Sequence, residues 1–309
     1  MYLGTLRKSP VSQQILFSAI VILMSGIFVM GLGFAGGLII FGTDITQMQS
    51  ALGDLSLPRN VAILKYFQIV QSFGLFIIPP VIIALFLHGK PSIYLKYKKF
   101  PLVKTILLVV AIVILADPLI NLLTEINSKL SLPSWMNSVQ VWMQEAENQA
   151  DKITKAFLGT QSFSDLLVNL FMIGILPAFG EELLFRGIIQ QLLKKLTKNA
   201  HSAIWISAAL FSALHMQFFG FVPRMLLGAM FGYMFEWSGT LWLPIIAHFI
   251  NNAAAVVAYY LESRRIIGDS FEKIGTSSGG SPYLVIISIG LLIIFFRTLY
   301  LKCSHNNAD

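Results

Sequence analysis

The sequence contains eight stretches of mostly apolar residues that are long enough, or nearly long enough, to cross a membrane as a helix. A helix needs about 20 residues to span the hydrocarbon layer. The stretches cover residues 14–41, 61–87, 102–124, 163–190, 201–218, 221–236, 241–261 and 282–301. Charged residues make up only 12% of the chain, whereas a soluble domain carries about 25%. The sequence therefore predicts an all-α polytopic membrane protein with about eight transmembrane helices, in one domain over residues 1–309.

The distribution of positive charge predicts how these spans are oriented. Lys and Arg accumulate in the cytoplasmic segments of membrane proteins. With a cytoplasmic N-terminus, twelve Lys and Arg fall in inner segments and eight in outer segments, while two acids fall inside and ten outside. We therefore expect both termini in the cytoplasm, and the short chain without a retention signal favours a bacterial inner membrane. The net charge of +7 then reflects topology and contact with membrane lipid, and we expect no nucleic-acid partner.

The longest segment between the predicted spans, residues 125–162, has apolar residues at three- and four-residue steps, which is typical of an amphipathic helix. These residues are Trp135, Val139, Trp142, Ala146, Ala150, Ile153 and Phe157. One interpretation is a helix that lies on the outer surface of the membrane. The other is a lid over a substrate site.

A glycine pattern in the first span, Gly31-x-Gly33-x-x-Gly36, matches the dinucleotide-binding fingerprint. That fingerprint has to follow a strand and open a helix, whereas these glycines lie inside a continuous apolar stretch. Small residues allow membrane helices to approach closely. We therefore interpret the glycines as helix-packing positions.

The fourth span contains three charged residues, Glu181, Glu182 and Arg186. Each ionised group near the centre of a membrane helix costs about 2.5–3.5 kcal/mol, so such groups persist where they face a polar cavity or one another. Glu182 and Arg186 are four residues apart with the acid first, which is the favourable order for an ion pair on a helix. Glu181 is left without a local counter-ion and is a candidate general base.

Two nearby spans carry further polar residues, namely His215 in span 201–218 and His248 with Asn252 on one face of span 241–261. A helical hairpin that turns near residues 197–200 would place Glu181 and His215 at the same depth, about 23–24 Å from the turn. His248 reaches this depth only if the turn around residues 238–239 lies within the bilayer. We therefore predict a polar intramembrane cavity shared by three spans. The alternative is that these residues only form hydrogen bonds between helices.

Glu181-Glu182-x-x-x-Arg186, Phe211-x-x-x-His215 and His248-x-x-x-Asn252 resemble the three ordered motifs of the CPBP family of intramembrane proteases. This family includes the type II CAAX prenyl endopeptidases and abortive-infection-like proteins. The resemblance covers about residues 165–257. It implies an intramembrane endopeptidase that cleaves peptide or membrane-protein substrates, including CAAX-like proteins, in a cavity open toward the cytoplasm.

The resemblance also implies a role for each motif residue. Glu181 would activate a water molecule for attack on the scissile carbonyl, and His215 would orient that water. His248 and Asn252 would donate hydrogen bonds to the developing oxyanion. The ion pair of the first motif would hold the helix and the charge of the cavity in place.

Other chemistries remain open for the same residues. Glu181, His215 and His248 also form the ligand set of a catalytic zinc site, although the sequence lacks His-Glu-x-x-His. We favour the reaction without a metal. A transporter with a polar site at the midplane of the membrane and a non-catalytic membrane scaffold are the rival functions.

Overall fold

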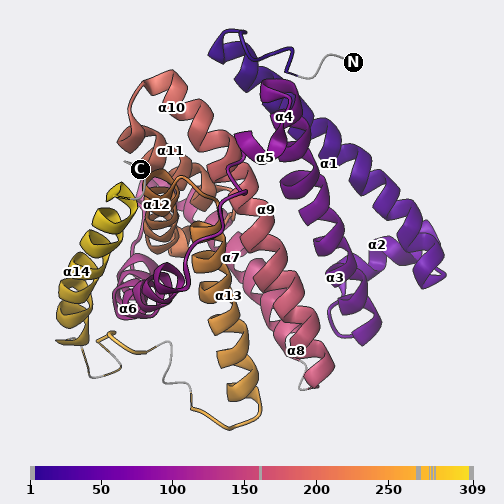
Figure 1. The fold of residues 1–309 in the computed structure, drawn as a ribbon. Coiled ribbons are helices and arrows are strands. Elements are labelled where there is room, and N and C mark those ends of the chain that lie inside the picture. The colour runs from indigo at the N-terminus through magenta and orange to yellow at the C-terminus, as the bar shows by residue number, and fades with distance from the viewer. Residues whose placement is uncertain are drawn as a thin grey trace.

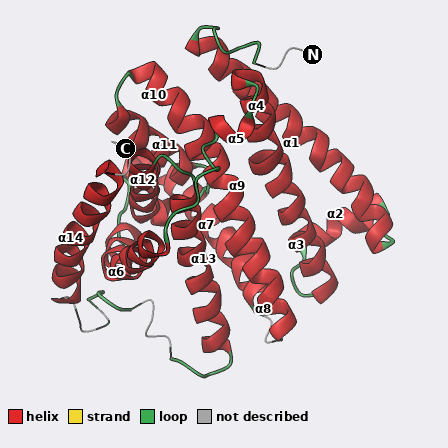
Figure 2. Cartoon of the chain, viewed as in Figure 1, coloured by secondary structure: helices red, strands yellow, loops and turns green. Residues whose placement is uncertain are grey.

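The computed structural model describes residues 4–159, 162–268, 273–277, 279, 281 and 283–305, except for the side chains of Leu52 and His305. These residues form a bundle of helices joined by loops, without strands (Figures 1 and 2). Seven helical rods within them are long and apolar enough to cross a membrane, and an eighth apolar helix is shorter. The expectation of an all-α integral membrane protein with about eight spanning helices is therefore confirmed.

The eight rods follow the predicted spans closely. Four consist of one helix each: α1 (Val11–Phe41), α6 (Val103–Ser128), α13 (Trp242–Ser263) and α14 (Tyr283–His305). The second rod comprises α3 (Pro58–Ser72), η1 (Phe73–Ile77) and α4 (Ile78–His88). The fourth comprises α8 (Phe163–Asn169), η3 (Leu170–Ile175), α9 (Leu176–Leu184), η4 (Phe185–Gln190) and α10 (Gln191–Thr197). The fifth rod is α11 (Ala200–Ala213). The sixth comprises η5 (Phe218–Gly220) and α12 (Phe221–Ser238). Pro282, the first residue of the last predicted span, lies outside the described residues.

Four short or peripheral helices connect the rods. They are α2 (Ile45–Gly53), α5 (Pro91–Tyr94), η2 (Ser134–Met136) and α7 (Asn137–Leu158). The helix predicted within residues 125–162 is therefore present as α7. It is amphipathic, and its position is described with the site below.

Two rods contain a π-helical segment directly before a proline, because proline has no N–H to donate. Pro79 and Pro80 follow η1, and Pro177 follows η3. The N–H of Ile78 reaches back to the carbonyl of Phe73, five residues earlier. Leu176 makes the corresponding bond to Phe171. These wider turns keep both rods continuous across the prolines.

The glycines of the first rod differ in what they face. A Cβ atom on Gly33 would overlap the side chain of Val70 in α3, and one on Gly36 would lie 3.0 Å from the hydroxyl of Tyr66. That hydroxyl donates a 2.9 Å hydrogen bond to the Gly33 carbonyl. A Cβ atom on Gly31 would meet nothing within 4 Å. The packing interpretation is therefore confirmed for Gly33 and Gly36 and is wrong for Gly31, which points away from the bundle.

We expect Gly33→Val to destabilise the protein and Gly31→Val to leave its stability nearly unchanged. The added methyl groups at Gly33 would force α1 away from Val70, and overpacking of this kind costs about 1–3 kcal/mol. Thermal unfolding of the two purified variants in the same detergent measures the difference. Equal melting temperatures would show that the contact between α1 and α3 does not depend on this glycine.

Both ends of the described chain lie at one end of the bundle (Figure 1). The N–H groups of Gly4 and Leu6 donate to the carbonyls of Leu85 and Phe86, near the end of α4. At the other end of the chain, the Tyr300 ring of α14 contacts Trp237, near the end of α12, with 5.4 Å between ring centroids. We call this side the terminal end of the bundle. The opposite side, which holds α2, α7 and the end of α13, is called the α7 end.

Candidate active site

Glu181 of α9 lies between two imidazole rings that come from different helices. Its Oε2 atom is 4.0 Å from Nε2 of His215 and 4.0 Å from Nε2 of His248. The Glu181 side chain is only 12% exposed, and Oε2 is buried without a hydrogen-bond partner among the described residues. The expectation that the three motifs meet in space is therefore confirmed.

Hydrogen bonds fix which nitrogen of each imidazole faces Glu181. Nδ1 of His215 lies 2.8 Å from the carbonyl of Phe211, and because a carbonyl only accepts, Nδ1 must donate. Nδ1 of His248 lies 2.9 Å from Oε1 of Glu182 and donates when that carboxylate is ionised. In the neutral tautomer, each ring then directs an Nε2 lone pair toward Glu181.

Glu182 and Arg186 form the predicted ion pair. Nη1 of Arg186 lies 2.7 Å from Oε1 of Glu182, and the two side chains are 1% and 0% exposed. Nη2 of Arg186 donates to the carbonyl of Gly228 in α12 at 2.6 Å. The guanidinium carbon lies 5.1 Å from the centre of the Phe211 ring and 5.6 Å from that of Phe231. The pair thus links the fourth, fifth and sixth rods, and through Glu182 it holds the His248 ring.

His215 lies just beyond the fifth rod, which corrects the prediction that the span continues to residue 218. α11 ends at Ala213. The backbone N–H of His215 donates to the carbonyl of Ser212, only three residues earlier. The Phe211 carbonyl, four residues earlier, accepts a hydrogen bond from Nδ1 of the His215 side chain instead. Met216 follows with a left-handed φ of 54°. The imidazole thus takes the place of a backbone donor, and the chain turns directly after it.

His248 reaches the depth of Glu181 because the turn before α13 is buried. Thr240 and Leu241 are 5% and 0% exposed. The N–H of Leu241 donates to the Lys96 carbonyl at 3.0 Å, and the hydroxyl of Thr240 donates to the Lys99 carbonyl at 2.8 Å. The segment of residues 96–99 therefore covers this turn and buries it within the bundle.

The side-chain amide of Asn252 forms two hydrogen bonds within the bundle. Its Nδ2 donates to the Ile173 carbonyl in η3 at 3.0 Å, and its Oδ1 accepts from Asn251 at 3.2 Å. One of the two N–H groups on Nδ2 is thus committed to the backbone. Asn251 therefore orients Asn252, a contribution that the motif spacing does not reveal.

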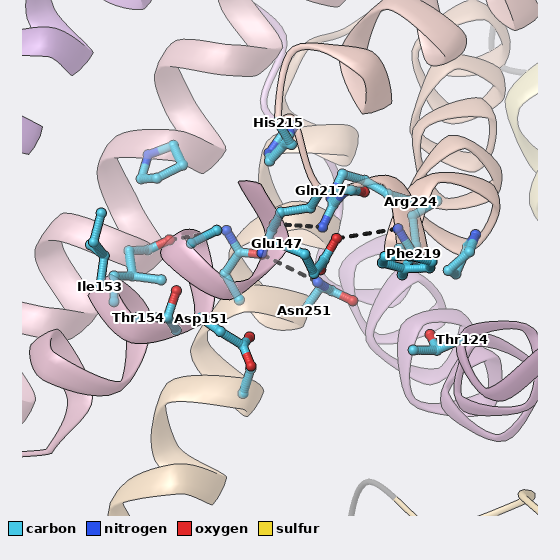
Figure 3. A pocket seen from close by; sticks show the side chains of 18 of the residues that line it. Thr124, Glu147, Asp151, Ile153, Thr154, His215, Gln217, Phe219, Arg224 and Asn251 are labelled. Carbon is cyan, nitrogen blue, oxygen red and sulfur yellow. Dashed lines mark hydrogen bonds between the residues drawn. The ribbon is translucent and has the colours of Figure 1, made fainter. Parts of the chain in front are cut away.

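A cavity of about 920 Å³ is lined by Glu181 and by residues of the α7 end, among them Glu147 and Asp151 (Figure 3). Glu147, Asp151 and Thr154 of α7 line one side of this pocket, and Gln217 with Arg224 lines another. The N–H of Phe219 donates to Oε2 of Glu147 at 3.2 Å and ties α7 to the loop before α12. α7 therefore forms a wall of the pocket, a position that favours the lid interpretation, although Trp135 remains 80% exposed.

The pocket contains functional candidates that sequence reasoning missed. One of them is Arg224, whose guanidinium lines the pocket and donates to the Gln217 side chain at 2.8 Å. Glu147 of α7 is another residue that lines the pocket. Gln68 of α3 also lines the pocket beside Glu181. The position of Arg224 one residue after Pro223, at the start of an apolar stretch, is the signal that could have identified it.

The end of the bundle toward which the pocket extends makes two expectations from the sequence incompatible with each other. The family resemblance implies a cavity open toward the cytoplasm, and the charge distribution predicts cytoplasmic termini. In the structure, the residues that line the wide part of the pocket belong to the α7 end, opposite to the described ends of the chain. The two expectations therefore cannot both hold.

Glu181, His215 and His248 lie somewhat farther apart than the ligand atoms of a tetrahedral zinc ion. Ligand atoms about 2.0–2.2 Å from such an ion lie roughly 3.3–3.6 Å apart, whereas Oε2 of Glu181 is 4.0 Å from each Nε2. Among the described residues, no group of three His, Cys, Asp or Glu side chains is placed to hold a metal ion. The gap of 4.0 Å does match the span of a bridging water molecule.

The fold and the site together define an integral membrane protein with a polar pocket of acids and histidines inside a helical bundle. The family model described as "Type II CAAX prenyl endopeptidase Rce1-like" matches residues 163–254, a segment that contains all three motifs. The match confirms the family resemblance that the motifs predict.

The comparison with curated proteins gives a relative of the same segment. YpbD of Bacillus subtilis (strain 168), described as an uncharacterized protein, is 33% identical over 89 residues. The aligned segment is 28% of this chain and 42% of YpbD. No solved structure matches the chain.

Proposed function

We propose that the protein is an intramembrane endopeptidase that hydrolyses peptide bonds of membrane-associated or CAAX-like protein substrates with a water molecule activated by Glu181. The observation that carries this proposal is the convergence of the Glu181 carboxylate with two Nε2 atoms, each at 4.0 Å. The Rce1-like match over residues 163–254 supports the reaction class. The pocket volume of about 920 Å³ is at the upper end of the range usual for binding sites and suits a peptide.

The arrangement suggests how the water would be held and activated. A water molecule about 2.8 Å from both Glu181 Oε2 and His215 Nε2 spans the gap between them. It donates one hydrogen to each, because both atoms accept, and keeps a lone pair for the scissile carbonyl carbon. Glu181 takes the proton as the new C–O bond forms. It then delivers the proton to the amide nitrogen as the C–N bond breaks, which gives a carboxylic acid and an amine.

The oxyanion role sets conditions on its two proposed donors. Nδ1 of His248 is committed to Glu182, so Nε2 donates only when the ring carries a proton on both nitrogens. The ring is held in position by the Glu182 carboxylate and by Phe231, which stacks on it with 5.3 Å between ring centroids. Asn252 offers the N–H that is not bonded to Ile173. A removed oxyanion donor typically costs about 10²–10³ in kcat.

We expect the purified protein in liposomes to cleave peptides of a membrane-protein peptide library, and to keep this activity after treatment with a metal chelator. Mass spectrometry in H₂¹⁸O would detect new C-termini that carry one ¹⁸O, which identifies hydrolysis. A library that stays intact contradicts the protease proposal and favours the transporter or scaffold functions. Loss of activity on chelation, with recovery on added zinc, contradicts the reaction without a metal.

A further inference from the structure

The terminal end of the bundle is closed beneath the candidate site. A core of buried apolar residues lies there and includes Leu87, Leu95, Leu192, Phe235 and Leu241, each at most 3% exposed. The segment after α4 covers this core through backbone and side-chain hydrogen bonds to the start of α13. Among them, Nε1 of Trp242 donates to the Tyr97 carbonyl at 2.7 Å.

A side-chain hydrogen bond strengthens this closure. Nε2 of Gln191 in α10 donates to the Tyr94 carbonyl at 3.0 Å. The Tyr94 side chain itself belongs to the core at 8% exposure, and this burial raises the pKa of its phenol to about 12. A substrate that approached from the terminal end would have to displace this packed layer to reach Glu181.

The α7 end, by contrast, is open to the site. The pocket that contains Glu181 is lined there by Ser128 at the end of α6, by Arg224 near the start of α12, by Ala255 in the second half of α13, and by α7. Trp135 and Trp142 of the η2–α7 segment are 80% and 48% exposed. Exposed tryptophans are typical of the membrane–water interface, so the mouth of the pocket lies near that surface.

Charge distinguishes the two ends of the bundle. The terminal end carries the basic segments of the chain, at Lys90, Lys96, Lys98, Lys99 and Lys104 and at Lys194, Lys195 and Lys198. The α7 helix carries three acids and two lysines. Lys and Arg in short loops mark the cytoplasmic side. The closed end is therefore the one whose charge is typical of the cytoplasmic side.

From the closed basic end and the open pocket at α7, we infer that the site faces the non-cytoplasmic side of the membrane. The substrates are then peptide segments that are exposed on, or anchored at, the outer leaflet, such as the extracytoplasmic parts of exported or membrane proteins. This orientation narrows the proposed function to membrane-associated substrates on the outer side and leaves cytoplasmic CAAX-like tails outside it. This assignment of substrates rests on the proposed function, whereas the orientation of the pocket does not.

Cysteine labelling in intact bacterial cells tests the orientation without any assay of activity. Cys303 is the only cysteine and is buried, so Cys303→Ser provides the background. Asn148→Cys places a thiol on α7 at the pocket, and Lys98→Cys places one on the segment that covers the terminal end. Both positions are exposed. A membrane-impermeant maleimide is applied before and after permeabilisation, with a cytoplasmic cysteine protein as the control for intact cells.

We expect Asn148→Cys to be labelled in intact cells and Lys98→Cys only after permeabilisation. The reverse pattern, or labelling of both variants only after permeabilisation, would overturn the inference. Both thiols must react in permeabilised cells, which shows that each variant is folded with its reporter accessible. If labelling shows that the pocket faces outward but the protein cleaves no peptide, the proposed function is contradicted and the inferred orientation still holds.

Discussion

Glu181→Gln is expected to lower the rate of peptide cleavage by about 10²–10⁴-fold, the usual contribution of a general base, while the fold persists. The amide has the shape of the carboxylate but cannot take a proton from water. Because Oε2 of Glu181 has no hydrogen-bond partner among the described residues, the substitution breaks no contact that supports the bundle. Cleavage rates of purified protein in liposomes, together with its melting temperature, measure both effects.

The matched control is Glu145→Gln, which makes the same chemical change on an exposed position of α7. We expect this variant to cleave at the rate of the unmodified protein. If Glu181→Gln retained full activity and an unchanged melting temperature, Glu181 would not be the base, and the proposed reaction would fail at its first step.

Arg186→Met is expected to lower the free energy of unfolding by about 3–5 kcal/mol, the cost of leaving one partner of a buried ion pair alone. Arg186 is 1% exposed and bonds both Glu182 and the Gly228 carbonyl. Its loss leaves the buried Glu182 carboxylate without its arginine counter-ion and with only Nδ1 of His248 as a hydrogen-bond partner. Unfolding of the purified variant in detergent, followed by heat or denaturant, gives the measurement.

Lys155→Met provides the comparison for the ion pair. Lys155 pairs with Asp151 at the same four-residue spacing, but the two side chains are 68% and 59% exposed. Surface pairs of this kind on a helix contribute about 0.3–0.5 kcal/mol. If both substitutions had the same small effect, the Glu182–Arg186 pair would contribute little to stability. The double variant Glu182→Leu with Arg186→Met should recover part of the loss, since it removes both charges.

The spanning helices could be predicted from the sequence because their length and apolar composition are fixed by the thickness of the membrane. The ion pair could also be predicted, since Glu182 and Arg186 lie on one rod and their spacing is local. The meeting of Glu181 with His215 followed from the length of a single hairpin. Each of these inferences needs only the geometry of a helix.

The remaining features depend on contacts between distant segments. The depth of His248 is set by the hydrogen bonds that bury Thr240 and Leu241 under residues 96–99, and no pattern near His248 encodes them. Arg224 enters the pocket because Gln217 holds its guanidinium. The pocket mouth depends on where α7 docks, which its amphipathic pattern leaves open. Sequence periodicity alone cannot supply such tertiary positions.

The π-helical segments have a consequence for how this site tolerates changes in chain length. η3 and η4 flank the helical turn that carries Glu181 and Glu182, and a π-helical turn corresponds to one extra residue relative to an α-helix. Deletion of one residue from η3 would convert the segment to regular helix without breaking the rod. The flanking parts of the rod would keep nearly the same direction, because the extra residue is accommodated within the π-helical turn itself. A one-residue deletion in α9 before Glu181, by contrast, would turn the carboxylates by about 100° relative to the start of the rod and separate them from their histidines.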